Sequence, residues 1–232
     1  MNTEAMVERL FPLLIAGDRA QARATVQTWT DEGTSAETLT QDVYWPLHEM
    51  VADLYHKDQL TTLAHHCAAR LLRTLVDQAQ SRYTQQERNG RTMMLFCGQS
   101  ETDDMAAQMV ADLAEADGWS VCFGGGGIAG DELLETAHER HPDVMLMFSS
   151  AAADAPVIRQ LIDQIRGVGA CPNMQIAVGG GVFNRAPGLA EEIGADLWAS
   201  TPADIITSLN ANPEQRATPE QRTVGRTIWA AA

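Results

Sequence analysis

The sequence has few basic residues and no long apolar run. It carries 16 Lys and Arg residues against 31 Asp and Glu residues, which gives a formal net charge of −15. Such a surface repels a phosphate backbone, so we expect no direct nucleic-acid binding and a basic rather than an acidic partner. No stretch reaches the roughly 18 apolar residues of a membrane helix, and the N-terminus lacks the basic-then-apolar order of a signal peptide. We therefore expect a cytoplasmic protein that does not enter the membrane.

The sequence also lacks the usual patterns of a metal site or a catalytic centre. Its cysteines, Cys67, Cys97, Cys122 and Cys171, are scattered without a CxxC pair or a zinc-type spacing. They are typical of buried thiols in a reducing compartment. We find no Ser-His-Asp order, no close carboxylate pair in an apolar stretch and no phosphate loop with a lysine. The sequence therefore predicts a protein that is not an enzyme.

The first part of the chain has the periodicity of helices. Apolar residues recur at helical spacing through residues 1–85, with almost no strand pattern. Helices are predicted in the segments 3–17, 18–33, 35–59 and 60–83. Pro46 lies inside the third segment, where it should kink the helix or mark its true start. Short connections between the segments predict a four-helix bundle over 1–85.

After a polar linker at 86–91, short apolar runs alternate with helical patterns. The runs that we predict as strands are 92–97, 120–124, 143–149, 174–179 and 195–200. The segments that we predict as helices between them are 102–117, 130–140, 155–166 and 187–193. This order predicts a Rossmann-like domain over 92–210, with a doubly wound, five-stranded parallel sheet. The polar segment 211–232 repeats PEQR and is expected to be a flexible tail. The fold class is therefore α plus α/β.

Every predicted strand ends in small residues. These ends are Gly98-Gln99-Ser100, Gly124–Gly127, Ser149–Ala153, Gly179-Gly180-Gly181 and Ala199-Ser200-Thr201. Ligands of such sheets bind beyond the carboxyl ends of the strands. We therefore expect an open crevice with exposed backbone groups, suited to a large flat ligand. The alternative is that tight turns simply favour glycine and serine.

Two patterns near these ends give weaker signals. Gly125, Gly127 and Gly130 form a GxGxxG, but it follows the second strand and no ribose-binding acid follows the next one. The acids Glu101, Asp103 and Asp104 open a helix, where the helix dipole stabilises carboxylates. A Mg²⁺ site is the alternative, although the other strand ends supply few ligands for one.

Three segments resemble one known family. They are MVADLAEADGWSV (109–121), VGGGVFNRAPGLAEEIGADLWASTPADII (178–206) and DLYHKDQLTTLAHHCAAR (53–70). The chain, from about residue 5 to 209, resembles the cobalamin (B12)-binding module of methionine synthase and of B12-dependent photoreceptors. It is most similar to the stand-alone tetrapyrrole-sensing antirepressor branch. The resemblance implies a tetrapyrrole held between the helical bundle and the α/β domain.

The family motif Asp-x-His-x-x-Gly, whose histidine binds cobalt from below, is altered here. In this sequence it becomes Glu101-Thr102-Asp103-Asp104-Met105-Ala106, with Asp103 at the histidine position and Ala106 at the glycine position. A carboxylate is a poorer cobalt ligand than imidazole. Three states remain open: cobalamin without a protein ligand below, a replacement such as heme or biliverdin, or loss of the ligand. Ser150 matches a family serine, and Phe148 replaces a small residue where the nucleotide tail of cobalamin would lie.

The resemblance also indicates which residues face the ligand. From the bundle it implies His66, which is also the candidate metal ligand, with His65, Tyr55, His48 and Trp45 nearby. From the α/β domain the candidates are Asp103, Ser150, Gly125, Gly179, Gly180, Gly181 and Thr201.

The implied function is a sensor that does not catalyse a reaction. Light, redox state or ligand loss would move the bundle and alter a regulatory protein partner such as a transcription factor. The alternatives are a corrinoid carrier for methyl transfer and a protein that handles bilin or heme. The bundle could also support a homodimer.

Overall fold

The protein, here a computed structural model, is described over residues 2–218 and divides into two compact units. The helical unit contains the described residues up to Asn89 together with Gln108–Gly118. The α/β unit contains Gly90–Ala107 and the described residues from Trp119 onward. The change from one unit to the other at Asn89 lies inside the segment predicted as a linker. The grouping of Gln108–Gly118 with the helical unit was not indicated by the sequence.

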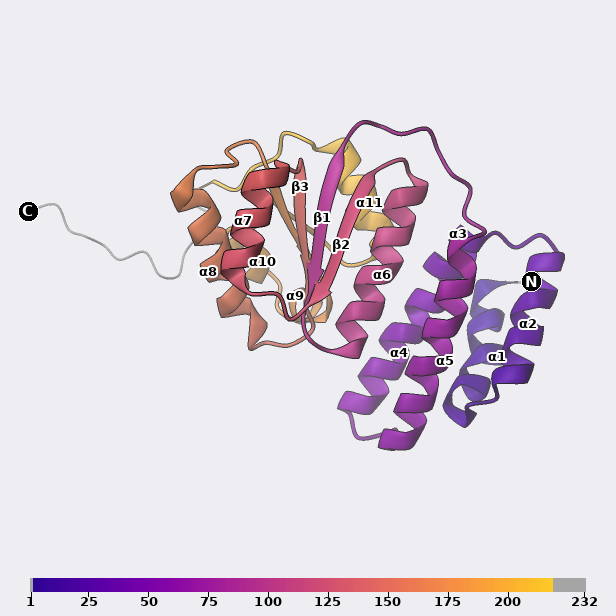
Figure 1. The fold of residues 1–232 in the computed structure, drawn as a ribbon. Coiled ribbons are helices and arrows are strands. Elements are labelled where there is room, and N and C mark those ends of the chain that lie inside the picture. Colours follow the sequence, from indigo (N-terminus) through magenta and orange to yellow (C-terminus); the bar gives the residue numbers. More distant parts are fainter. Residues whose placement is uncertain (1, 219–232) are drawn as a thin grey trace, which may run out of the picture. The chain divides into compact units, whose positions relative to one another are not determined.

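The helical unit begins with helices whose starts are set by side-chain caps (Figure 1). Asn2, Asp18, Ser35 and Thr61 each accept a hydrogen bond from a backbone N–H in the first turn of the following helix, which satisfies a donor that the helix leaves free. The elements are α1 (Thr3–Ala16), α2 (Arg19–Asp31), α3 (Ala36–Leu39), the π-helical turn η1 (Thr40–Tyr44), α4 (Trp45–His56) and α5 (Thr62–Gln80). The predicted helical character of this part of the chain is confirmed.

The third predicted helix is not continuous. The turn η1 separates α3 from α4, and Pro46 stands in the first turn of α4. Proline has no backbone N–H and is tolerated at that position, where the donor would have no partner inside the helix. The N–H of Trp45 instead donates to Thr40 O, five residues earlier. The wider turn η1 thus joins the two helices without a loop.

A buried carboxylate, Asp112, lies in the helical unit. It comes from α6 (Glu101–Ala116), and its Oδ1 accepts hydrogen bonds from Gln80 Nε2 at 3.0 Å and Gln108 Nε2 at 2.7 Å. Its Oδ2 has no hydrogen-bond partner in the described part of the chain. Burial, with Glu115 and Asp77 nearby, raises the Asp112 pKa to about 6, and the hydrogen bonds from the two glutamines oppose that rise.

We expect this carboxylate to make the helical unit less stable as the pH rises. The folded-state pKa of Asp112 lies above the unfolded value, so the folded chain holds the proton more tightly, and stability falls as the pH rises from about 4 to about 6. Asp112→Asn should raise the free energy of unfolding above pH 7 by about 1–3 kcal/mol, because it removes a buried charge and keeps an oxygen that can accept from the glutamines. Urea unfolding from pH 4 to pH 8 measures this, with the exposed Asp42→Asn as control. An unchanged pH profile in Asp112→Asn would contradict the expectation.

The α/β unit is built on a parallel sheet of five strands in the order β2-β1-β3-β4-β5. The strands are β1 (Thr92–Cys97), β2 (Ser120–Gly126), β3 (Val144–Phe148), β4 (Gln175–Gly179) and β5 (Leu197–Ala199). The helices after α6 are α7 (Gly130–Arg140), α8 (Asp154–Val168), α9 (Gly181–Arg185), α10 (Leu189–Ile193) and α11 (Pro202–Ala211). The predicted doubly wound, five-stranded fold is confirmed. Thr201 as N-cap and Pro202 in the first turn mark the start of α11, a helix absent from the sequence prediction.

The strands β1, β3 and β4 are buried on both faces of the sheet, whereas β2 at the edge is only partly buried. Alternate residues of β1, β3 and β4 pack into one core with side chains of α7, α8 and α10, and Figure 1 shows these helices on one side of the sheet with α11 on the other. The remaining strand residues point to the opposite face because side chains alternate along a strand. Burial on both faces explains why the strands read as nearly continuous apolar runs.

Asp196 connects several parts of this unit. Its Oδ2 accepts from Arg166 of α8 and from the Ile176 N–H of β4, and its Oδ1 accepts from the Ala217 N–H at 2.8 Å. Gln215 Nε2 also donates to the Asp196 carbonyl at 2.8 Å. The described start of the predicted flexible tail, 212–218, is therefore held against the sheet. The side chains of Asp196 and Gln175 form hydrogen bonds with its backbone N–H and carbonyl groups. The rest of that predicted tail, 219–232, lies outside the described residues.

Candidate functional site

The strand order brings the carboxyl ends of β1 and β3 side by side at the centre of the sheet. β1 pairs with β2 on one side and with β3 on the other, so the connections after β1 and after β2 run in opposite directions. The loops that leave β1 and β3 therefore diverge to opposite faces of the sheet. In open α/β sheets this point of reversal is where ligands bind. The ends of β1, β3 and β4 form the candidate site.

Asp103, the residue at the histidine position of the family motif, is folded inward at this point. It is only 3% exposed, and its Oδ2 has no hydrogen-bond partner in the described chain. A Cβ placed on Gly98 would lie 2.4 Å from Asp103 Oδ2 and 2.9 Å from Asp154 Oδ2, so both carboxylates converge on the end of β1. Burial raises the Asp103 pKa, and the nearby Asp154 charge raises it further. Hydrogen bonding by Ser100 and Ser150 lowers the pKa and so opposes that rise. The α6 start thus presents a buried carboxylate and no imidazole.

Asp154 and Ser149 complete this arrangement, and neither was among the predicted site residues. Ser149 Oγ donates to Asp154 Oδ2 at 2.6 Å, and Asp154 opens α8. The sequence carried one signal for them, since Ser149 ends the third predicted strand and Asp154 starts the next helix. Ser150, which was predicted, lies beside them, and its carbonyl accepts a hydrogen bond from Arg185 of α9.

Most glycines at the strand ends do not leave open space, contrary to the expectation of an open crevice at every end. A Cβ on Gly126 would lie 2.3 Å from the Gly98 carbonyl oxygen, and one on Gly180 would lie 2.4 Å from the Ser149 carbonyl oxygen. The Phe148 ring similarly occupies the space beside Gly179, and the Arg185 guanidinium occupies the space beside Gly181. The glycines are needed because neighbouring backbone and side chains approach closely. Whether the space beside a glycine is open or filled depends on packing, which composition alone does not reveal.

The other predicted residues of this unit have simpler environments. Gly125 has a φ of +73°, and the nearest atom to a Cβ there is Asp104 Oδ1 at 3.4 Å. Gly127 has open space around it. Thr201 caps α11, with its hydroxyl accepting from the Asp204 N–H at 3.1 Å. The β2 end therefore has the most room of the strand ends.

The predicted residues of the helical unit form two clusters of aromatic and histidine rings. The Tyr55 and His65 rings are stacked with centroids 4.0 Å apart, and the His66 ring centroid lies 5.8 Å from that of His65. The Trp45 and His48 ring centroids are 5.4 Å apart. His48 is buried, which lowers its pKa to about 4, with a smaller contribution from the charge of His65. His66 is exposed and His65 is half-buried.

These residues bring no complete metal-binding set together. Across residues 2–218, no group of three or more His, Cys, Asp or Glu side chains has the arrangement to hold a metal ion. His66, the candidate ligand, therefore stays a prediction. No helix within the described residues is long and apolar enough to span a membrane.

Family models match both parts of the chain. A B12 binding domain model matches residues 91–206, and a second B12 binding domain model matches residues 6–80. A search of curated proteins gives no significant match.

Solved structures share the fold at low sequence identity. The monomethylamine corrinoid protein of Methanosarcina barkeri superposes with a TM-score of 0.78 and 13% identity, over 90% of this chain and all of that one. A methanol:cobalamin methyltransferase complex of Methanosarcina barkeri gives a TM-score of 0.50 and 14% identity, over 91% of this chain and 81% of that one. At such identities the likeness establishes the fold alone.

Proposed function

Because this chain belongs to the B12 binding domain family, we propose that it binds cobalamin at the carboxyl edge of its sheet and acts as a sensor that does not catalyse a reaction. The output would pass to a separate regulatory protein, such as a transcription factor. The observation that carries the sensor role is Asp103, a buried carboxylate where the family motif has its cobalt-binding histidine. Methyl transfer depends on tuning of cobalt by that axial ligand, and the start of α6 offers no imidazole for it.

The residues at the strand ends fit part of what a corrinoid requires. Gly125 and Gly127 at the end of β2 have room beside them, so backbone groups there stay within reach of a bound ligand. Ser100, Ser149 and Ser150 add hydroxyl groups at the ends of β1 and β3. When bound, cobalamin would supply a cobalt centre whose colour and axial ligation change with light and redox state. The lower-ligand position is the part that does not fit, because Asp103 faces Gly98 and Asp154.

The first test asks whether α6 supplies a cobalt ligand. Protein labelled with ¹⁵N is loaded with cob(II)alamin, and electron paramagnetic resonance reports splitting by a protein nitrogen. The His66→Ala substitution removes the candidate ligand of the helical unit. In that variant, with Asp103 unchanged, we expect no splitting by a protein nitrogen. Adding Asp103→His should create it, because a neutral imidazole is the better ligand. The exposed Glu101→His in the same turn is the control and should add nothing.

Two outcomes separate the parts of this proposal. Nitrogen splitting in His66→Ala with Asp103 intact would mean that another imidazole of the chain binds cobalt, and the argument from Asp103 would fail. Loss of splitting from wild type to His66→Ala would support His66 as a metal ligand, as the sequence predicted. The same loading with heme or biliverdin compares the alternative ligands, since each has a distinct visible spectrum.

A corrinoid carrier is the second candidate, favoured by the fold shared with the monomethylamine corrinoid protein. A carrier should accept a methyl group on reduced cobalamin and pass it on while keeping the cofactor bound. A sensor should instead change its shape with the state of the ligand. Small-angle X-ray scattering of the loaded protein in the dark and after illumination would show a change for the sensor. Methyl turnover without any shape change would favour the carrier.

A further inference from the structure

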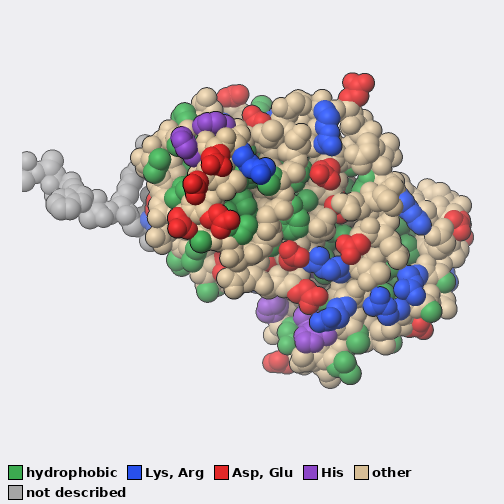
Figure 2. Space-filling model, in the orientation of Figure 1, with side chains coloured by type: hydrophobic (Ala, Val, Ile, Leu, Met, Phe, Trp, Pro, Cys, Tyr) green, Lys and Arg blue, Asp and Glu red, His purple; other side chains and the backbone are tan. Residues whose placement is uncertain are grey.

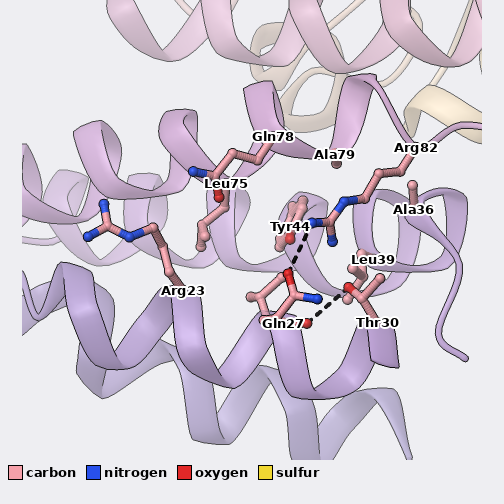
Figure 3. Close-up of a pocket in the computed structure, with 11 residues that line it drawn as sticks. Arg23, Gln27, Thr30, Ala36, Leu39, Tyr44, Leu75, Gln78, Ala79 and Arg82 are labelled. Atoms are coloured by element: carbon pink, nitrogen blue, oxygen red, sulfur yellow. Dashed lines mark hydrogen bonds between the residues drawn. The ribbon is translucent and has the colours of Figure 1, made fainter. Parts of the chain in front are cut away.

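A cavity in the helical unit is lined by residues that the proposed function does not use. It has a volume of about 30 Å³ and lies between α2, η1 and α5 (Figure 3). A cavity that holds one water needs about 10–15 Å³, so this cavity has room for a small group of more than one heavy atom. The polar residues that line it are Arg23, Gln27 and Thr30 of α2, Tyr44 of η1, and Gln78 and Arg82.

The polar lining is rich in hydrogen-bond donors and positive charge. Figure 3 shows the Arg82 side chain directed toward Gln27 and Tyr44, whereas the Arg23 guanidinium points away from them. Arg82 Nη2 donates to Gln27 Oε1 at 3.0 Å, and Gln27 Nε2 donates to Asp31 Oδ1 at 2.6 Å, which orients the Gln27 amide. Neither guanidinium forms an ion pair with a carboxylate within residues 2–218. In a chain of net charge −15, the Arg82 guanidinium beside Tyr44, without an acidic partner, marks a place for an external anion.

Tyr44 adds a buried donor. Its side chain is fully buried, and its hydroxyl has no hydrogen-bond partner among the described residues. Burial raises the Tyr44 pKa, as does Tyr83, while the nearby Arg82 charge opposes the rise. A buried hydroxyl without a partner costs about 1–3 kcal/mol, so an acceptor that reaches it would be stabilising. The Arg82–Gln27 hydrogen bond is exposed to solvent, so an incoming oxygen can compete for it.

The remaining walls are apolar. Val26, Leu39, Leu75 and Ala79 line the cavity and are all buried. A planar guanidinium matches the two oxygens of a carboxylate, and apolar walls suit a short hydrocarbon chain. Figure 2 shows that, on the face drawn, Lys and Arg side chains gather over the helical unit.

We propose that this cavity binds a short aliphatic monocarboxylate, with Arg82 holding the carboxylate and Val26 and Leu75 contacting the chain. The Tyr44 hydroxyl donates to one carboxylate oxygen. This site does not depend on the proposed cobalamin binding, since all of its residues belong to the helical unit.

The test is a titration of the full chain with sodium propionate, followed by thermal unfolding and by NMR of the arginine Nε–Hε groups. Sodium chloride at equal ionic strength and neutral propionamide are the ligand controls, because salt alone screens surface charge. A saturable rise in Tm with propionate, accompanied by a shift of the Arg82 signal, supports the site. An equal response to chloride, to propionamide or to inorganic phosphate overturns it.

Variants test the residues one by one. Arg82→Gln should weaken propionate binding about tenfold, since it removes a charge-assisted hydrogen bond. Tyr44→Phe should leave the unliganded protein as stable as wild type or more so, yet weaken binding several-fold, because the hydroxyl has no internal partner. Arg19→Gln is the charge-matched control. Arg19 lies one turn before Arg23 on α2 and outside the cavity lining, so this variant should bind like wild type. Unchanged binding in Arg82→Gln, or a less stable unliganded Tyr44→Phe, overturns the assignment.

Discussion

Replacing Gly180 with alanine should destabilise the α/β unit by about 3 kcal/mol or more, through strain and a backbone clash. Gly180 has φ +101° and ψ 173°, a conformation that side-chain-bearing residues rarely adopt. The added Cβ would lie 2.4 Å from the Ser149 carbonyl oxygen. That oxygen also accepts the Val182 N–H at 3.2 Å, so its displacement would disturb the start of α9. Because these atoms belong to the ends of β3 and β4, cobalamin binding should weaken as well.

Two other glycines supply controls that separate the causes. Gly127 has a φ of +80° but open space around it, so Gly127→Ala tests strain alone and should cost about 1 kcal/mol. Gly130 has an ordinary φ and open space, so Gly130→Ala should be neutral or slightly stabilising. Thermal unfolding measures all three variants, with the expected order Gly180→Ala, then Gly127→Ala, then Gly130→Ala in loss of Tm. A Gly180→Ala protein as stable as Gly130→Ala would show that the close approach at Ser149 is absent.

Asp196→Ala is expected to cost about 3 kcal/mol, because it removes the carboxylate of a buried ion pair. The Asp196 side chain is 1% exposed, and its loss leaves the Ile176 N–H inside the sheet without its acceptor at 2.7 Å. Arg166, which is 30% exposed, can turn to solvent, so most of the cost comes from the backbone donors. Asp196→Asn keeps an acceptor and should lose roughly half as much.

The same substitution should loosen the end of the segment 212–217 at Ala217, while the hydrogen bonds from Gln175 remain. Ala217 donates to Asp196 Oδ1, and Gln175 Nε2 donates to the carbonyls of Asn212 and Gln215. Urea unfolding measures the stability change, and limited proteolysis followed by mass spectrometry locates cleavage in 212–217. Glu139→Ala, which removes an exposed carboxylate of α7, is the control and should alter neither result. Equal cleavage of Asp196→Ala and wild type would show that other contacts hold the segment.

Local patterns in the sequence determined most of the architecture. The switch from helical spacing to short apolar runs after the linker predicted the helical part and the five-stranded parallel sheet, both of which the structure contains. Segments such as 178–206 carried the resemblance to the B12-binding family, which the family models confirm. These features were readable because caps, strand runs and motif spacings depend on residues close together in the chain.

The sequence was less informative wherever residues distant in the chain meet. It indicated open strand ends at Gly126 and Gly180, whereas backbone atoms from other strands fill that space. It placed Asp103 at a ligand position but gave no sign that the carboxylate turns toward Gly98 and Asp154. The charge-rich cavity beside Tyr44 and the attachment of 212–217 to Asp196 were likewise absent from any local pattern. Periodicity determined which elements form, while the packing of those elements decided where each side chain points and what it contacts, since such contacts join residues far apart in the chain.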